Sequence, residues 1–143
     1  MCPDKNLAKN IVDKMLGGDA FSQWLGIEVL EIYEGYCKLK MTVREEMTNG
    51  FKIAHGGIAY SLADSCLAFA ANSDGIQSVS VETSISHTKK VLSEDTLIAQ
   101  AKEINKSSKT ALYKISITNQ KNEEIALFKG TVYLTGKKWF SEK

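Results

Sequence analysis

The stretch from Gly57 to Asn72, GIAYSLADSCLAFAAN, is apolar around almost its whole circumference when it is drawn as a helix. A helix that is hydrophobic on nearly every side is enclosed by the rest of its protein. The stretch therefore predicts one long core helix, around which the other elements of the chain must pack.

Segments with a period of two predict strands on both sides of this helix. Upstream, Ile27 to Val43 alternates around the turn Glu34-Gly35, which indicates a hairpin with one wet face. Residues 44–56 have no clear period and predict a loop of a length that is usually kept for function. Downstream, four strand-like runs are separated by polar turns: Ser78 to His87, Leu97 to Ile104, Ala111 to Thr118 and Ile125 to Leu134.

This order of elements predicts an α+β fold, with an antiparallel sheet wrapped around one long central helix and the last strands arranged as a meander. A single sheet of this kind has unpaired edges. We therefore expect a dimer that extends the sheet across two subunits.

The N-terminal segment predicts a helical lead-in. Pro3 suits a first helical turn, and Leu7, Ile11 and Met15 recur at helical spacing before Gly17-Gly18 ends the pattern. Phe21 to Leu25 predicts one further turn. With 143 residues, the chain fits a lead-in over residues 1–20 and a single domain over residues 21–143.

Composition limits the partners and the compartment. The chain has 18 Lys and Arg against 17 Asp and Glu, so no overall charge favours nucleic acid or an anionic membrane. Cys2, Cys37 and Cys66 lack metal-ligand spacing, and with two histidines no metal site is expected. The N-terminus has no signal-peptide pattern, and the cysteines suit reduced thiols, so we expect a cytoplasmic protein.

Asp64 is the acidic residue in the middle of the core helix, where an ionised carboxylate is costly unless it lines a cleft or is hydrogen-bonded. Helical projection groups it with four residues, opposite a second group that faces the core. The first group is Tyr60, Ser61, Ala68 and Ala71, and the second is Ile58, Leu62, Cys66 and Phe69. The carboxylate either holds a loop by hydrogen bonds or performs chemistry.

The motif His55-Gly56-Gly57 immediately before the helix favours chemistry. The first-turn N–H groups lie beside residues without side chains, and such a terminus stabilises a carbonyl oxygen that gains negative charge. The seven residues from Gly57 to Asp64 span roughly 10 Å, too far for both groups to reach one carbon atom. A two-fold dimer with antiparallel core helices would bring Gly57 of one subunit to Asp64 of the other.

The ordered set Thr48-Asn49-Gly50, His55-Gly56-Gly57 and Leu62-Ala63-Asp64 resembles the PaaI-type branch of hotdog-fold acyl-CoA thioesterases. The resemblance covers about residues 21–135 and includes Ser80-Val81-Glu82 and the run from Ala126 to Thr131. It implies a hotdog fold, hydrolysis of an aromatic acyl-CoA, and a tetramer built from two dimers. It implies no cofactor, because coenzyme A belongs to the substrate.

The resemblance also implies roles for single residues. Asp64 would activate water or attack the thioester directly, the Gly57 N–H and the Asn49 side chain would hold the thioester oxygen, and Ser80 would position the water. His55 would orient the loop or the acyl group. From the strand pattern alone, Ser80 is equally well a hydroxyl on the solvent face, because serines alternate with Val79 and Val81.

Substrate contacts are expected from Gly56, Tyr60 and Ala68, and the lysine pair Lys89-Lys90 could meet the phosphates of coenzyme A as point charges. A lysine pair in a turn also fits plain solvation. Here the chain departs from its relatives, many of which have Arg-Pro or Ser-Pro at this point, and His87 stands where an aromatic residue is common.

Two other functions remain open on the same fold. One is a non-catalytic acyl-CoA sensor or carrier, which would not need Asp64. The other is a dehydratase of 3-hydroxyacyl thioesters, in which a histidine works with the carboxylate; His55, nine residues before Asp64, fits that role poorly.

Overall fold

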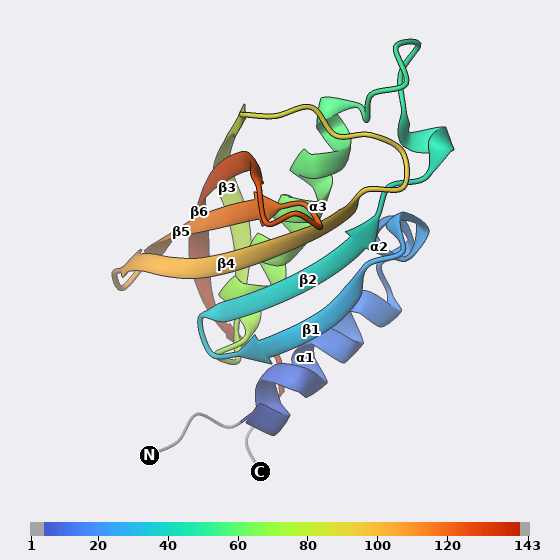
Figure 1. Cartoon of the computed structure of the whole chain (residues 1–143). Helices are drawn as coiled ribbons and strands as arrows, with labels where there is room; N and C mark the ends of the chain where they lie inside the picture. Colours follow the sequence, from blue (N-terminus) through green and yellow to red (C-terminus); the bar gives the residue numbers. More distant parts are fainter. Residues whose placement is uncertain (1–4, 141–143) are drawn as a thin grey trace.

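The structure is a computed structural model that describes residues 5–140, so Cys2 and Pro3 lie outside the described residues. Six antiparallel strands form one sheet that curves around the helix α3 (Gly56–Asn72), as Figure 1 shows. The strands are β1 (Glu28–Tyr33), β2 (Tyr36–Thr42), β3 (Ile76–His87), β4 (Thr96–Lys106), β5 (Thr110–Thr118) and β6 (Glu124–Lys138). The predicted α+β architecture, a sheet wrapped around one long helix, is confirmed.

The hairpin of β1 and β2 follows the predicted alternation. Cys37, Leu39 and Met41 are buried, while the lysines between them stay partly exposed. Gly35 takes a positive φ of 76° in the connecting turn, a conformation that costs glycine little. The inner face of β2 therefore packs on α3, and its outer face meets solvent.

The core side of α3 is the side that the projection predicted. Leu62, Cys66 and Phe69 are fully buried, and Ile58 is nearly so. Ala71 is the exception, because it was expected on the Asp64 side and is buried. The last turn of α3 is enclosed on all sides, and the indole N–H of Trp139 donates to Asn72 there at 2.9 Å.

The prediction of a simple meander after α3 is wrong for the first of these strands. The sheet order is β1-β2-β4-β5-β6-β3, so β3 lies at the far edge and pairs with β6 instead of β4. Residues 88–95 must then cross over to reach β4, and in Figure 1 this connection passes the N-terminal end of α3. It is fixed there by bonds from Thr88 N to Ile125 O and from Ala54 N to Val91 O, both 2.9 Å or shorter.

Two helices precede the sheet, as the sequence predicts. α1 (Lys5–Gly17) lies beside β1 (Figure 1), and Ile11 and Val12 are among its buried residues. α2 (Ala20–Leu25) begins at the N-cap Asp19 and ends at Gly26, which has a positive φ of 77°. Within residues 5–140, no helix is long and apolar enough to cross a membrane.

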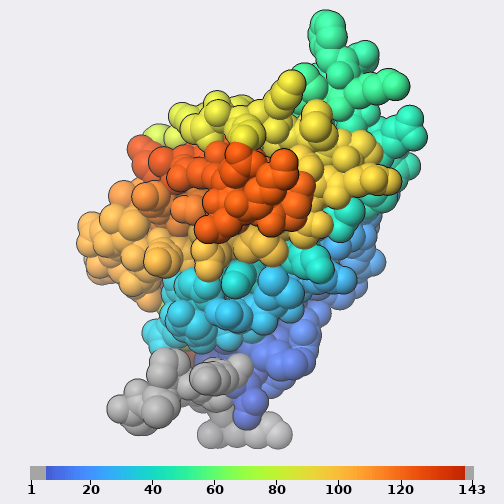
Figure 2. Space-filling model, in the orientation of Figure 1, coloured from blue at the N-terminus to red at the C-terminus, as the bar shows by residue number. Residues whose placement is uncertain are grey.

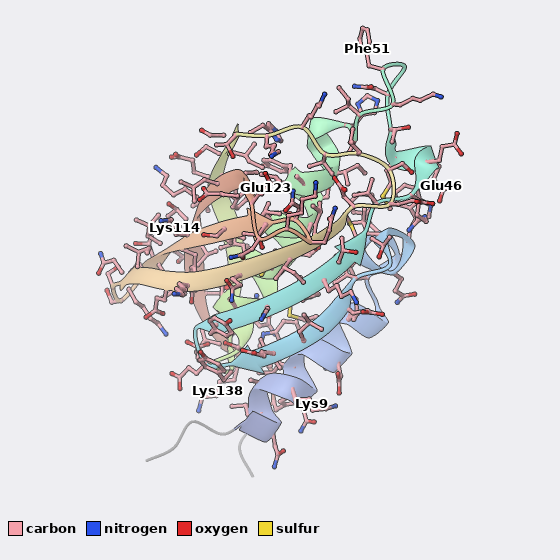
Figure 3. All side chains as sticks on the ribbon, in the orientation of Figure 1. Lys9, Glu46, Phe51, Lys114, Glu123 and Lys138 are labelled. Atoms are coloured by element: carbon pink, nitrogen blue, oxygen red, sulfur yellow. The ribbon has the colours of Figure 1, made fainter. Side chains whose placement is uncertain are left out.

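The loop over residues 44–56 contains a short 3-10 helix, η1 (Glu45–Met47), and a tight turn around Phe51. The turn is closed by a bridge between Thr48 and Ala54. It projects from the body of the molecule in Figure 2, and the Phe51 ring points away from the body in Figure 3. Phe51 is 85% exposed.

The contact between β6 and α3 leaves no room for a side chain at Gly130. A Cβ atom there would lie 2.5 Å from Cδ2 of the buried Leu67. We expect Gly130→Ala to lower the free energy of unfolding by about 1–3 kcal/mol, because Leu67 must leave its packed position. Urea unfolding followed by circular dichroism measures the change.

Gly17→Ala is the matched control for this substitution, because a Cβ at Gly17 meets nothing within 4 Å. Its free energy of unfolding should not be lower than that of the wild type. Adding Leu67→Val to Gly130→Ala should recover part of the loss if the two side chains compete for one space. Additive losses in the double variant would contradict the assigned contact.

Candidate active site

One face of α3 is covered only in part by the rest of the chain. Tyr60, Ser61, Asp64, Ser65 and Ala68 are half-buried, whereas their neighbours toward the sheet are buried. The residues on this face are mostly small. They recur every three or four positions along the helix, and therefore form a single stripe on its surface. The stripe leaves room for a ligand or for another protein surface beside the carboxylate.

Asp64 and Ser80 lie in the same pocket. The pocket has a volume of about 60 Å³ and is lined by Asp64, Leu67, Ala68, Ser78, Ser80 and Val132. The structure therefore brings together three residues that the sequence singled out, namely Asp64, Ser80 and Ala68. Their elements, α3 and β3, are in contact in the fold.

Ser78 and Ser80 of β3 line the pocket beside α3, whereas Ser84 and Ser86 are exposed. Val79 is 55% and Val81 is 61% exposed, although strand alternation alone does not decide whether the valines or the serines face the core. Bulges at Ile76/Ser78 and at Ser80/Glu82 shift the register of β3 against β6. Ser80 is exposed among the described residues and also lines the pocket of Asp64, so its role in positioning water stays a prediction.

Ser78 is a polar residue of this pocket that the sequence reasoning missed. Its Oγ atom is buried and has no hydrogen-bond partner among the described residues. A buried hydroxyl without a partner is uncommon and is usually satisfied by water or a ligand. The alternating serines of residues 78–86 were a signal for it, but not for the face on which they lie.

The Asp64 carboxyl has no hydrogen bond or ion pair with any side chain or backbone group in residues 5–140. Burial raises the pKa of this carboxyl above its usual value, and the negative charge of Asp19 raises the pKa further. A structural acid that holds a loop would be hydrogen-bonded to that loop. The observed geometry favours the chemical reading of Asp64.

A second, larger pocket lies at the N-terminal end of α3. It has a volume of about 360 Å³ and is formed by the loop before α3 and the crossing segment after β3. Its lining includes His55, Gly56, His87, Lys89 and Lys90. The position of β3 at the sheet edge explains this grouping, because residues 88–95 must pass the end of α3 to reach β4.

The two glycines of the motif differ in their surroundings. A Cβ at Gly56 would lie 3.1 Å from Nε2 of His87, so the imidazole packs closely on this part of the backbone. At Gly57, which does not line the pocket, a Cβ would meet nothing within 4 Å. His55 is the N-cap of α3, and its exposed side chain makes no capping bond. The Gly57 backbone is therefore not covered by other described residues of the chain.

His87 is a residue of this pocket that the sequence reasoning did not select. It appeared there only as a departure from the aromatic residue common in relatives. The structure places it at the end of β3, against Gly56, on the strand that also carries Ser80. Its position on the strand of Ser80 was the signal that could have identified it.

Asn49 holds the turn that precedes α3. Its Oδ1 atom accepts hydrogen bonds from the backbone N–H groups of Phe51 at 2.9 Å and Ile53 at 3.2 Å. Both bonds use the carbonyl end of the side chain, so the Nδ2 group is the end that can donate to a ligand oxygen.

Two of the predicted contact residues, Lys89 and Tyr60, have partners of their own within the chain. The Lys89 ammonium group forms an ion pair with Glu123, which is labelled in Figure 3. The Tyr60 hydroxyl is hydrogen-bonded to Thr83, and its ring packs edge-on against Phe128 with centroids 5.2 Å apart. Tyr60 lines neither of the two pockets described here.

The two pockets do not merge within one subunit. Asp64 lines one and the residues at the N-terminal end of α3 line the other, in agreement with the roughly 10 Å rise between Gly57 and Asp64. Within residues 5–140 no group of three or more His, Cys, Asp or Glu side chains is arranged to hold a metal ion.

Comparisons with known proteins point to one family. The sequence model of the thioesterase superfamily matches residues 51–126. A proposed esterase from Archaeoglobus fulgidus is 40% identical over 127 residues, 89% of this chain and 82% of that protein. The acyl-coenzyme A thioesterase PaaI of Escherichia coli is 36% identical over 122 residues, 85% of this chain and 87% of that protein.

Solved structures agree with these matches. The E. coli PaaI protein, from the phenylacetic acid degradation operon, superposes with a TM-score of 0.91 at 34% identity, over 94% of this chain and 97% of that chain. The smu.793 protein of Streptococcus mutans, solved with acetyl CoA bound, has a TM-score of 0.76 at 25% identity, over 78% and 90% of the two chains.

Proposed function

Because this chain belongs to the thioesterase superfamily, in its PaaI-type hotdog branch, and is a thioester hydrolase, we propose that it hydrolyses an acyl-CoA with Asp64 as the acid/base residue. The observation that carries the proposal is the half-buried Asp64 carboxyl, which has no hydrogen-bond partner in residues 5–140 and shares a pocket with Ser80. Burial and the nearby Asp19 raise the pKa of Asp64, which makes its carboxylate a stronger base.

In the proposed reaction, Asp64 removes a proton from a water molecule whose oxygen attacks the thioester carbon. The carbon–sulfur bond then breaks, coenzyme A leaves as a thiolate that takes up a proton, and the free acid remains. Direct attack by the carboxylate, with an anhydride that water then opens, uses the same geometry. Ser80 lies in the pocket of Asp64, where its hydroxyl can orient the water.

The oxygen of the thioester would be held by the Gly57 N–H and the Asn49 side chain. The open backbone at Gly57 supports this assignment, as does the free Nδ2 end of Asn49. Two donors at the positive end of a helix stabilise the negative charge that develops on this oxygen.

The site would be completed across a two-fold dimer, because one subunit keeps Asp64 and Gly57 in separate places. Antiparallel packing of two α3 helices through their half-buried faces would bring each Asp64 to the Gly57 of the other subunit. The edge strand β3 supports this arrangement, since its outward valines, Val79 and Val81, are 55% and 61% exposed. The tetramer that the family resemblance implies would pair two such dimers.

The pocket at the N-terminal end of α3 would receive coenzyme A. Its floor is largely apolar, which suits the pantetheine arm, and its rim carries Lys89, Lys90, His55 and His87. Lys89 would have to exchange Glu123 for a phosphate, whereas Lys90 lines the same rim beside it. His55 would orient the loop or the acyl group, and Gly56, Tyr60 and Ala68 would border the acyl chain.

The proposed acyl group is aromatic, as the origin of E. coli PaaI in a phenylacetic acid operon suggests. A thiol-release assay over aromatic, medium-chain and 3-hydroxyacyl-CoA substrates tests the proposal. We expect release of free coenzyme A, highest kcat/KM for aromatic acyl groups, and a carboxylic acid as the other product. Tight binding without thiol release would support an acyl-CoA carrier, and an enoyl product would support a dehydratase.

A further inference from the structure

A chain of hydrogen bonds through two serine hydroxyl groups connects helix α2 to helix α3, which carries Asp64. Ser22 is buried, and its Oγ atom lies 2.5 Å from Oδ2 of Asp19 and 2.8 Å from Oγ of Ser65 on α3. An ionised carboxylate only accepts hydrogen bonds. Ser22 therefore donates to Asp19, and Ser65 donates to Ser22.

This chain of bonds has a defined anchor at Asp19. Besides Oδ2, the Oδ1 atom of Asp19 accepts the backbone N–H of Ser22 at 2.9 Å and so caps α2. Both carboxylate oxygens are thus fixed by a single serine. The carboxylate can neither turn away from α3 nor be replaced by a residue of another shape without loss of one of these bonds.

Ser65 follows Asp64 directly on α3, and both residues lie on the half-buried face. The bonded chain therefore ends one residue from the proposed base. Asp19 and Ser22 lie outside residues 51–126, the part that matches the thioesterase family. The tie joins the lead-in segment of this chain to the central part of its site.

Asp19 also supplies the charge that acts on Asp64. The other residues of the Asp64 pocket are neutral: Leu67 and Ala68 from α3, Ser78 and Ser80 from β3, and Val132 from β6. Burial is the larger cause of the raised pKa of Asp64, and the negative charge of Asp19 is the second. In a partly desolvated pocket such a charge is screened less than it is in water.

We propose that Asp19 is a positioning residue for the reaction: through Ser22 and Ser65 it fixes the face of α3 that carries Asp64, and it holds a carboxylate beside that face. The proposal rests on the role given to Asp64 under the proposed function. Asp19 touches neither the substrate nor the reacting atoms in this scheme, because its carboxylate is bound to Ser22.

Asp19→Asn tests the proposal, since asparagine caps a helix as well as aspartate and keeps an oxygen for the Ser22 N–H, but carries no charge. Without that charge Asp64 loses its proton at lower pH, so the acid limb of the kcat profile should move to lower pH. Asp13→Asn is the matched control, because it removes an exposed carboxylate of α1 that pairs with Lys9. Its acid limb should coincide with that of the wild type.

A measurement without substrate separates this inference from the proposed function. The ¹³C NMR titration of the Asp64 carboxyl should show a lower midpoint in Asp19→Asn than in the wild type and in Asp13→Asn. If this shift is observed although no acyl-CoA is hydrolysed, the link between Asp19 and Asp64 stands and the proposed function fails. Equal midpoints in all three proteins would overturn the link.

Ser22→Ala separates the charge from the bonded chain, because it keeps Asp19 and removes the hydroxyl between Asp19 and Ser65. We expect a lower kcat with an acid limb closer to that of the wild type than to that of Asp19→Asn. If Asp19→Asn does not fold, Asp19→Ser, which retains a capping hydroxyl, takes its place. An unchanged kcat in Ser22→Ala would overturn the positioning role.

Discussion

Asp64→Asn should lower kcat by about 10²–10⁴-fold at neutral pH, the range that loss of a positioned acid or base produces. Asparagine has nearly the shape of aspartate but cannot accept the proton of water or attack the thioester. The measurement is thiol release from the best acyl-CoA of the panel, with the wild type and Asp64→Asn compared at equal protein concentration. Turnover within a few-fold of the wild type would exclude Asp64 as the acid/base residue.

A stability measurement tests whether Asp64→Asn loses activity through the missing acid/base group and not through unfolding. The raised pKa of Asp64 means that the folded chain binds its proton more tightly than the unfolded chain does. As the pH rises from the unfolded pKa of about 3.9 through the folded value, this group therefore lowers the free energy of unfolding. Above that window Asp64→Asn should be at least as stable as the wild type, and a large loss of stability would point to a structural role.

Gly57→Pro should lower kcat by about 10²–10³-fold, because it removes a backbone N–H from the site of the developing negative charge. Proline is tolerated in the first turn of a helix, where the N–H has no partner within the helix. Mixing this variant with Asp64→Asn should restore activity. In mixed dimers, one of the two shared sites receives both an intact Gly57 and an intact Asp64.

Random mixing makes half of the dimers mixed, each with one intact site of two, so the recovery should be about a quarter of wild-type activity. Asp64→Asn mixed with Asp64→Ala is the control and should show no recovery. Gly57→Ala keeps the N–H and meets nothing within 4 Å, so it should fold normally and lose less activity than Gly57→Pro. No recovery in mixed dimers isolated by two different affinity tags would show that the sites are not shared.

The secondary structure followed from the sequence because each element has a local signal. The apolar circumference of residues 57–72 predicted α3, and alternation around Gly35 predicted the hairpin of β1 and β2. The candidate site was predicted in part by the same means, because an acid in a buried helix and a glycine pair before it are unusual wherever the rest of the chain lies. The resemblance to the PaaI-type branch added Asn49 and Ser80.

The errors arose where distant segments decide the outcome. Placement of β3 beside β6 depends on which strand covers the remaining side of α3, and no local pattern contains that information. The bulges that shift the register of β3 beside Ser78 and Ser80 reflect pairing with β6. The same holds for His87, which became part of a pocket because residues 88–95 cross the end of α3.

The sequence by itself determined the helix, the strands, the likeness to a family and the residues with reactive groups, because these depend on neighbours a few positions apart. Only the tertiary structure decided which of these groups meet. It placed Asp64 and Ser80 in one pocket, apart from the pocket at the N-terminal end of α3. It also connected Asp19 to Ser65 through the hydroxyl group of Ser22. The physical reason is that burial, desolvation and hydrogen bonding act between atoms that are close in space, and for these residues the packing of the sheet around α3 creates that closeness.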